Sequence, residues 1–189
     1  MRKLKLQVQM TIDGFISGVH GESDWMSKNW DDEFRKYEYD LATSSDTLLM
    51  GRKMTNDFIS HWEDVAKNQP DNDWHSFARE MVKIKKLVFS KSVKSIKGEN
   101  LRVENGDLPS IVKSLKGESG KDLLVYGGAN FVSSLLKERL VDEMYLFVNP
   151  AIIGQGKAIF KEITTMQQFK LVSSKQFDCG VIVMVYKLV

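Results

Sequence analysis

The segment that most constrains the fold is an apolar run that stops at two adjacent glycines and continues as a helix. Residues 123–126 favour a strand, Gly127 and Gly128 follow, and a helical pattern runs from Asn130. Glycines let a ligand approach the backbone closely, and the free N–H groups at the start of a helix favour an anion. The pattern predicts a phosphate site, with an ordinary strand-to-helix turn as the alternative.

Strand and helix patterns alternate along most of the chain. This alternation predicts an α/β fold with a mostly parallel sheet flanked by helices. Its last strands, 169–177 and 181–188, are joined by a short turn and predict a C-terminal antiparallel hairpin. With 189 residues, the chain is expected to form one domain over 1–189. The other expected strands are 1–10, 47–50, 87–89, 101–103, 122–126 and 143–148, and the expected helices are 31–44, a short one near 58–62, 74–81, 109–117 and 130–138.

Charge and composition exclude several classes of partner. The net charge of +2 arises from 27 basic and 25 acidic side chains and gives no indication of nucleic-acid binding. No segment approaches the roughly 20 apolar residues that cross a bilayer, and the N-terminus alternates apolar and polar residues unlike a signal peptide. The single cysteine, Cys179, cannot form an internal disulfide, so a reducing cytoplasm is expected. It is interpreted as a half-buried strand residue, with a reactive thiol as the alternative.

Candidate ligand-binding residues follow four of the predicted strands. In an open α/β sheet, ligands bind beyond the carboxyl ends of the strands. Arg52, Ser90 and Lys91 offer a planar fork, a hydroxyl donor and a point charge, which suit the 2′-phosphate of NADPH. Each cation has a solvated surface charge as its alternative. The four groups are Asp13-Gly14, Gly51-Arg52-Lys53, Ser90-Lys91 and Gly127-Gly128-Ala129-Asn130.

Other familiar sites are not indicated. The Gly-x-Gly-x-x-Gly fingerprint of a Rossmann fold is absent near the start of the chain, and no P-loop Gly-Lys-Ser/Thr occurs. His20, His61 and His75 are scattered, so no metal site is predicted. No serine lies in a nucleophile elbow, and Cys179 has no histidine nearby in the sequence.

Five segments resemble one known family. They are 10–17 (MTIDGFIS), 49–53 (LMGRK), 125–130 (VYGGAN), 135–143 (LLKERLVDE) and 150–156 (PAIIGQG). Together they resemble the dihydrofolate reductase-like fold, and within it the reductase domain of the bifunctional riboflavin-biosynthesis proteins and its free-standing bacterial relatives. The last two segments are similar to the riboflavin-type reductases specifically, and the similarity covers nearly the whole chain.

The resemblance implies an NADPH site, a small-molecule substrate and a homodimer. The 150–156 loop, with Gly154 and Gly156, would border the cofactor and the substrate. The cofactor-binding residues implied are Gly51, Arg52, Lys53, Ser90, Lys91, Gly127, Gly128, Ala129, Asn130, Gly154 and Gly156.

The chain departs from the family pattern at three points. Thr11 stands where the family often has serine. Met54 stands where the family commonly has threonine, and Thr55 follows one position later. No deaminase domain is attached, so the chain differs from the bifunctional protein.

The predicted function is an NADPH-dependent reductase of a small heterocyclic or imine substrate, such as 5-amino-6-(5-phosphoribosylamino)uracil. The alternatives are a dihydrofolate or pterin reductase, a non-catalytic NADPH-binding or sensing protein, and a ligand-free interaction module. Reducing a C=N bond also needs a proton, and Asp13 and Asp32 are the candidate acids; a helix N-terminal charge is the alternative role of Asp32. Trp25 and Trp30 are expected either to stack on the substrate or to pack in the core. The loop 17–27 is a candidate for a mobile lid over the cofactor.

Overall fold

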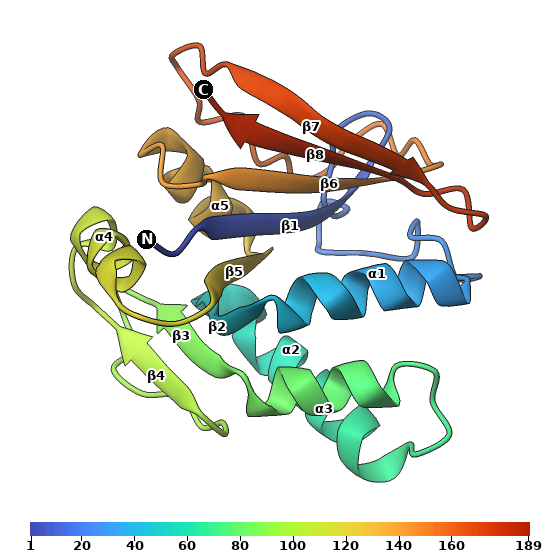
Figure 1. Ribbon diagram of the computed structural model, residues 1–189, viewed down its shortest axis with the longest axis horizontal. Helices are drawn as coiled ribbons and strands as arrows, with labels where there is room; N and C mark the ends of the chain where they lie inside the picture. Colours follow the sequence, from blue (N-terminus) through green and yellow to red (C-terminus); the bar gives the residue numbers. More distant parts are fainter.

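A computed structural model describes residues 1–189 as one eight-stranded sheet with helices on both faces (Figure 1). The strand order is β4-β3-β2-β5-β1-β6-β8-β7. The strands are β1 Leu4–Thr11, β2 Ser45–Gly51, β3 Lys85–Phe89, β4 Leu101–Glu104, β5 Asp122–Gly127, β6 Glu143–Asn149, β7 Phe169–Gln176 and β8 Ile182–Leu188.

The first six strands are parallel, and β8 pairs antiparallel with both β6 and β7. The predicted C-terminal hairpin is therefore confirmed, and so is the mostly parallel α/β sheet. Figure 1 shows the hairpin at one edge of the sheet and β4 at the other.

Four of the five helices agree with the sequence prediction to within two residues at each end, and α2 does not. The helices are α1 Asp32–Thr43, α2 Arg52–Asn68, α3 His75–Lys83, α4 Leu108–Gly117 and α5 Ala129–Lys137. Helix α2 is longer than the short helix predicted near 58–62. The prediction was too short because α2 buries only Thr55, Ile59 and Val65, so most of its residues are polar and give a weak helical pattern. Helix α5 stops at Lys137 rather than 138.

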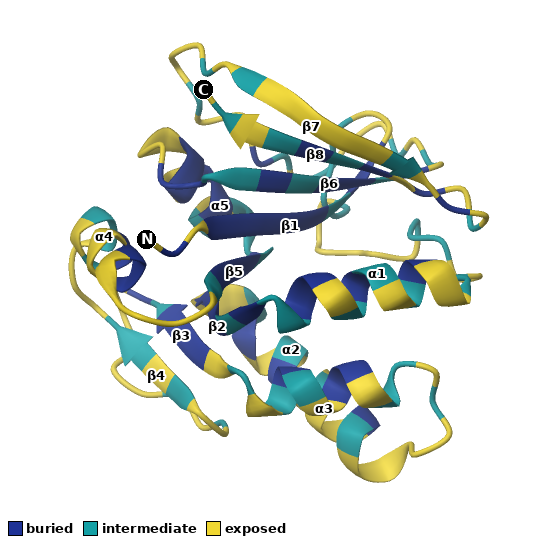
Figure 2. Ribbon diagram, in the orientation of Figure 1, coloured by how far each residue is buried: buried dark blue, intermediate teal, exposed yellow.

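The sheet separates the core into two sides. Successive residues of a strand point to opposite faces, so Leu123 and Val125 pack on the α4 and α5 side while Leu124 packs on the α1 and α3 side. On the α1 and α3 side the core forms two clusters, one over β6 and β8 around Phe34, the other over β2, β3 and β5 around Phe77. Figure 2 shows β1 and β5 deeply buried and β7 mostly exposed.

Strand β1 lies between these two clusters and presents polar residues to the gap. Its apolar residues, such as Leu6 and Val8, join the core on the α5 side, whereas Gln7 lies on the opposite face and is 1% exposed. Strand β1 pairs with β5 only from Leu4 to Leu6, but it pairs with β6 as far as Thr11. The sheet therefore opens between β1 and β5 towards their carboxyl ends.

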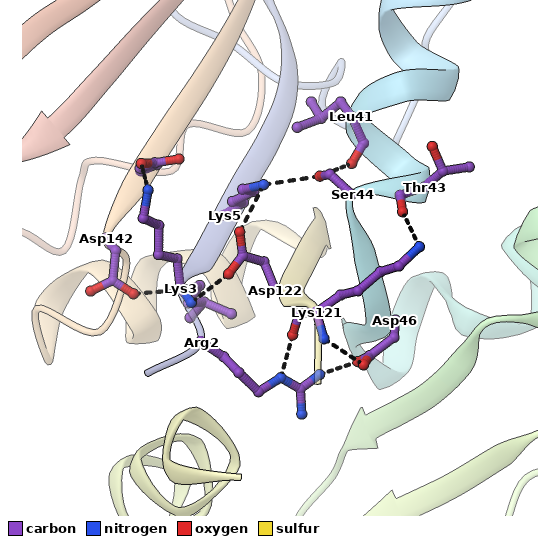
Figure 3. Close-up of polar contacts among 12 residues, drawn as sticks. Arg2, Lys3, Lys5, Leu41, Thr43, Ser44, Asp46, Lys121, Asp122 and Asp142 are labelled. Atoms are coloured by element: carbon purple, nitrogen blue, oxygen red, sulfur yellow. Dashed lines mark hydrogen bonds and ion pairs between the residues drawn. The ribbon is translucent and has the colours of Figure 1, made fainter. Parts of the chain in front are cut away.

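The amino ends of the parallel strands are held by ion pairs (Figure 3). Lys5 Nζ lies 2.9 Å from Asp122, and Lys116 Nζ lies 2.6 Å from Asp142. The same carboxylates accept the backbone N–H groups of Lys3 and Leu4, at 2.8 and 2.7 Å. These contacts hold the amino ends of the strands together, at the opposite end from the opening between β1 and β5.

Two further features concern the surface. None of the five helices combines the length and hydrophobicity needed to cross a membrane. Cys179 is a free, partly buried thiol in the turn before β8, and burial raises its pKa. Cys179 is therefore half-buried as expected, but it lies in the turn between β7 and β8 rather than in a strand.

Candidate active site

A cleft of about 1290 Å³ lies at the carboxyl ends of the parallel strands, where β1 and β5 separate. It extends from the loop after β3 to the first loop of the chain. Nine of the residues predicted to bind the cofactor line it: Gly51, Arg52, Lys53, Ser90, Lys91, Gly127, Gly128, Ala129 and Asn130.

Two glycine turns from neighbouring strands meet at one wall of the cleft. A Cβ on Gly128 would lie 3.4 Å from the Cα of Gly51, and Gly128 has a φ of +88°. A Cβ on Gly51 would lie 2.8 Å from the Cβ of Phe131. Gly51 is therefore required because a Cβ there would clash with Phe131, and Gly128 because its left-handed φ strains any other residue.

Helices α2 and α5 begin at these glycines, and neither has a side-chain cap. By contrast, Asp31 and Asp107 cap α1 and α4 by accepting the N–H groups of Phe34 and Ser110. The first turns of α2 and α5 therefore present free N–H groups and two positive dipole ends to one wall of the cleft. This arrangement suits a ligand with more than one phosphate.

Cations lie beside this wall without carboxylate partners. Arg52, Lys53 and Lys91 are exposed, line the cleft and form no ion pair within the protein. Ser90 is buried, and its hydroxyl oxygen accepts the N–H groups of Ser92 and Val93 at 3.1 Å. That turn holds the chain after β3 against the cleft.

The two aspartates predicted to supply a proton lie elsewhere. The Asp13 carboxylate accepts the N–H groups of Gly154 and Ile153, at 2.7 and 3.2 Å, and is not part of the cleft lining. Hydrogen bonding from Thr11, and then from Gly154 and Ile153, lowers the pKa of Asp13. The Asp32 side chain is 97% exposed and pairs with Arg35. The geometry places neither acid where a ligand in the cleft would meet it.

Gly154 and Gly156 also lie outside the cleft lining. They belong to the loop that holds the first loop of the chain in place. A Cβ on Gly156 would lie 2.3 Å from the carbonyl oxygen of Ser17, and Ser17 pairs with Lys157 in an isolated bridge. Lys157 itself reaches the cleft.

The predicted lid, 17–27, forms one side of the cleft through His20, Ser23 and Met26, among others. It is fixed at both ends. Ser17 is tied to Lys157, and the Ser27 N–H donates to Asn149 Oδ1 at 3.0 Å. Between these anchors its hydrogen bonds are local, for example from the Trp25 indole to the Glu22 carbonyl.

Aromatic side chains form part of the cleft lining. Trp30, Phe58, Trp62, Trp74 and Tyr126 all line the cleft. They also contact one another and the core, with Trp30 and Trp74 edge to face at 5.1 Å. The two roles considered for Trp30, in the core and facing the ligand, are therefore compatible.

Met54 lines the cleft, and Thr55 does not. Thr55 is fully buried and its hydroxyl donates to the carbonyl of Gly51 at 3.2 Å. This hydrogen bond stabilises the turn after β2 from its buried side.

The sequence prediction missed Glu38 in α1. This side chain is 7% exposed, lies on the floor of the opening between β1 and β5, and lines the cleft. Burial raises the pKa of Glu38 from 4.5 to about 7, although hydrogen bonds from Gln9 and Gln7 oppose the rise. A signal was present, because Glu38 is four residues after Phe34 and three before Leu41, on the apolar stripe of the helix.

The parallel sheet that opens between β1 and β5, with two glycine turns at the opening, is that of the dihydrofolate reductase-like fold. The chain belongs to the RibD C-terminal domain family, whose model matches residues 2–183. This confirms the resemblance found in the sequence and makes the chain a member of a reductase-like family of riboflavin biosynthesis.

Relatives of similar length occur in Bacillus subtilis (strain 168). The uncharacterized protein YyaP is 33% identical over 190 residues, which cover 98% of this chain and 94% of YyaP. The uncharacterized protein YwjB is 27% identical over 180 residues, covering 95% of each chain.

Solved structures show the same fold. A putative riboflavin biosynthesis protein from Shewanella sp. PV-4 has a TM-score of 0.76 and 22% identity, over 99% of both chains. A Thermotoga maritima deaminase/5-amino-6-(5-phosphoribosylamino)uracil reductase has a TM-score of 0.68 and 18% identity. The match covers all of this chain and 57% of the Thermotoga protein.

Proposed function

We propose that the protein is an NADPH-dependent reductase of a small heterocyclic or imine substrate. One observation carries this proposal. A single cleft joins an anion-binding wall, made by two uncapped helix starts and unpaired cations, to an aromatic compartment that contains a buried acid. The first half suits the phosphates of a dinucleotide, and the second suits a flat, polar ring.

The residues present fit the cofactor. Gly51, Gly127 and Gly128 leave the backbone bare where side chains would otherwise fill the turn. The N–H groups at the starts of α2 and α5 would hold the pyrophosphate, and Arg52 and Lys91 would bind the 2′-phosphate. When bound, the nicotinamide supplies the hydride.

The protein's own side chains would orient the acceptor and exclude water. Trp30, Phe58 and Tyr126 offer ring faces and edges to a planar substrate. The loop 17–27 borders the same compartment, where it can shield the reacting atoms from solvent. These roles need no metal.

For the substrate we propose a phosphoribosylated aminopyrimidine. Membership of the RibD C-terminal domain family supports this, as does the likeness to the Shewanella riboflavin biosynthesis protein and to the Thermotoga 5-amino-6-(5-phosphoribosylamino)uracil reductase. A pterin is the second candidate because it has the same flat aminopyrimidine ring.

The test is NADPH oxidation, followed at its absorbance, with the deaminated aminouracil phosphate and with dihydrofolate as acceptors. We expect oxidation with the aminouracil and little with dihydrofolate. The reverse preference would identify a pterin reductase. Tight NADPH binding with no oxidation by either acceptor would instead support a non-catalytic binding or sensing protein.

A further inference from the structure

Glu38 is the only acidic side chain that the structure both buries and places in the cleft. Its surroundings are polar but uncharged. Gln7 and Gln9 of β1 donate to Glu38 Oε1, at 3.0 and 2.7 Å. No protein group hydrogen-bonds to the other oxygen, Oε2, and that oxygen is not sealed from the cleft.

A relay of hydrogen bonds fixes this orientation. Asn149, fully buried at the end of β6, donates through Nδ2 to Gln9 Oε1 at 2.8 Å. Gln9 must then turn its Nε2 towards Glu38. Asn149 Oδ1 in turn accepts the N–H of Ser27, so the relay runs from the acid to the anchor of the lid.

The cleft also gathers buried polar atoms that lack partners. The structure has four such side-chain atoms, and three of them, Gln7 Oε1, Trp30 Nε1 and Tyr126 Oη, belong to residues that line this cleft. Buried polar groups are normally hydrogen-bonded, and unsatisfied ones are costly. Tyr126 directly follows Val125, which pairs with Leu6, so Tyr126 and Gln7 flank the point where the strands separate. Gln7 and Tyr126 therefore make the cleft beside Glu38 polar, which suits a ligand with polar edges.

We propose that Glu38 is the catalytic acid that gives a proton to the substrate nitrogen, and that Gln7, Gln9 and Asn149 position it. This assignment rests on the proposed reductase function. The substrate C=N carbon takes the hydride from NADPH and its nitrogen takes the Glu38 proton, which yields CH–NH and NADP⁺. Glu38 is left as a carboxylate and regains its proton from water.

The charge of Glu38 is set by its burial and its two amide partners. No charged group contributes to its pKa shift, which leaves the pKa at about 7. The titratable neighbour is Tyr126, whose pKa burial raises well above its ordinary value, so it stays neutral. His20, His61, Asp57, Arg52, Lys53 and Lys157 line the wider cleft. An acid poised near neutral pH suits proton transfer.

The test compares Glu38→Gln and Glu38→Asp with Glu33→Gln, which alters an exposed acid of the same helix that pairs with Lys175. The acceptors are the aminouracil phosphate, dihydrofolate and a simple cyclic imine. Removal of a general acid costs about 10²- to 10⁴-fold in rate. We therefore expect Glu38→Gln to lower kcat by at least 100-fold with an NADPH Kd within about twofold of wild type, and Glu38→Asp to restore part of kcat.

A second readout needs no turnover. The infrared absorption of a protonated carboxyl should disappear with a midpoint near pH 7 in the ligand-free wild type and in Glu33→Gln, and be missing in Glu38→Gln. The same midpoint should limit kcat at high pH in the wild type and in Glu33→Gln, but not in Glu38→Gln.

The outcomes separate the two proposals. A wild type that does not bind NADPH, or that binds it but oxidises it with none of the three acceptors, would overturn the proposed function and this assignment with it. If NADPH is bound and oxidised, two results would overturn the assignment alone: Glu38→Gln with more than a tenth of wild-type kcat, or a carboxyl midpoint near 4.5.

Discussion

At the scale of single residues, side-chain types near strand ends predicted many of the residues that line the cleft but missed Glu38. Arg52 and Lys91 follow parallel strands, whose carboxyl ends meet at one edge, so position in the sequence was enough to bring them to the cleft. Glu38 lies within a helix, and only its register against Phe34 and Leu41 indicated that it is buried. The Asp13 carboxylate instead accepts the N–H groups of Ile153 and Gly154 in the 150–156 loop. The sequence does not reveal that these two N–H groups are available.

The first prediction concerns Arg52, which we expect to bind the 2′-phosphate of NADPH. Loss of a charge-assisted contact costs about 1.5–3 kcal/mol, or about 10- to 100-fold in affinity. We expect Arg52→Ala to weaken NADPH binding by this factor and to leave NADH binding nearly unchanged, as measured by calorimetric titration. Lys36→Ala, which removes an exposed cation of α1 paired with Asp40, is the control. An unchanged ratio of the NADPH and NADH affinities would refute the role.

Glu38 also makes stability depend on pH. Its pKa is raised from 4.5 to about 7 in the folded protein, so the folded state holds the proton that the unfolded state releases. Stability is therefore full below pH 4.5, falls as pH rises, and is lower by about 3 kcal/mol above pH 7. We expect Glu38→Gln to unfold like wild type at pH 5 and to be more stable at pH 8, by up to that amount in urea. Equal differences at both pH values would contradict the buried-acid interpretation.

At the scale of elements, periodicity predicted the strands and the hairpin, while the helices were predicted less completely. Helix α2 was underestimated because its buried stripe is narrow. Strand β1 shows a different difficulty. Its alternation of apolar and polar residues is typical of a half-exposed strand, yet Gln7 and Thr11 are each 1% exposed because α1 and the neighbouring strands cover the polar face.

The meeting of the β2 and β5 turns is an element-scale prediction. We expect Gly51→Ala to destabilise the fold by about 1–3 kcal/mol and to weaken NADPH binding, because its Cβ would lie 2.8 Å from Phe131. Gly117→Ala is the matched control, since a Cβ there meets nothing within 4 Å at the end of α4. Urea unfolding and NADPH titration of both variants measure the difference. Equal behaviour of the two variants would contradict the close approach of the turns.

At the scale of the whole molecule, the stabilising ion pairs and the cleft lie at opposite ends of the parallel strands. Partly buried ion pairs hold the amino ends of the strands (Figure 3), and the cleft opens at their carboxyl ends. The homodimer expected from the resemblance stays a prediction. So do the limits of a single domain and the roles of Gly154 and Gly156 towards a cofactor.

Asp122 tests this separation. Burial opposes its charge, but hydrogen bonds from Lys3 and Lys5 lower its pKa overall, so its contribution is present above its ordinary pKa and is lost as pH falls through the lowered value. Asp122→Asn leaves the buried Lys5 ammonium without a counter-charge, which costs about 3 kcal/mol near pH 7. We expect that loss in urea unfolding with an unchanged NADPH Kd in the folded variant. A weakened Kd without a loss of stability would contradict the separation.

The central claim is that the cleft binds NADPH, and thermal unfolding with added nucleotide tests it most directly. At 100 times its Kd, a ligand adds about 2.7 kcal/mol, or about 5–10 °C in Tm for a chain of this size. We predict this rise with NADPH, and at the same concentration a smaller one with NADH. No rise with either nucleotide at millimolar concentration would contradict the account.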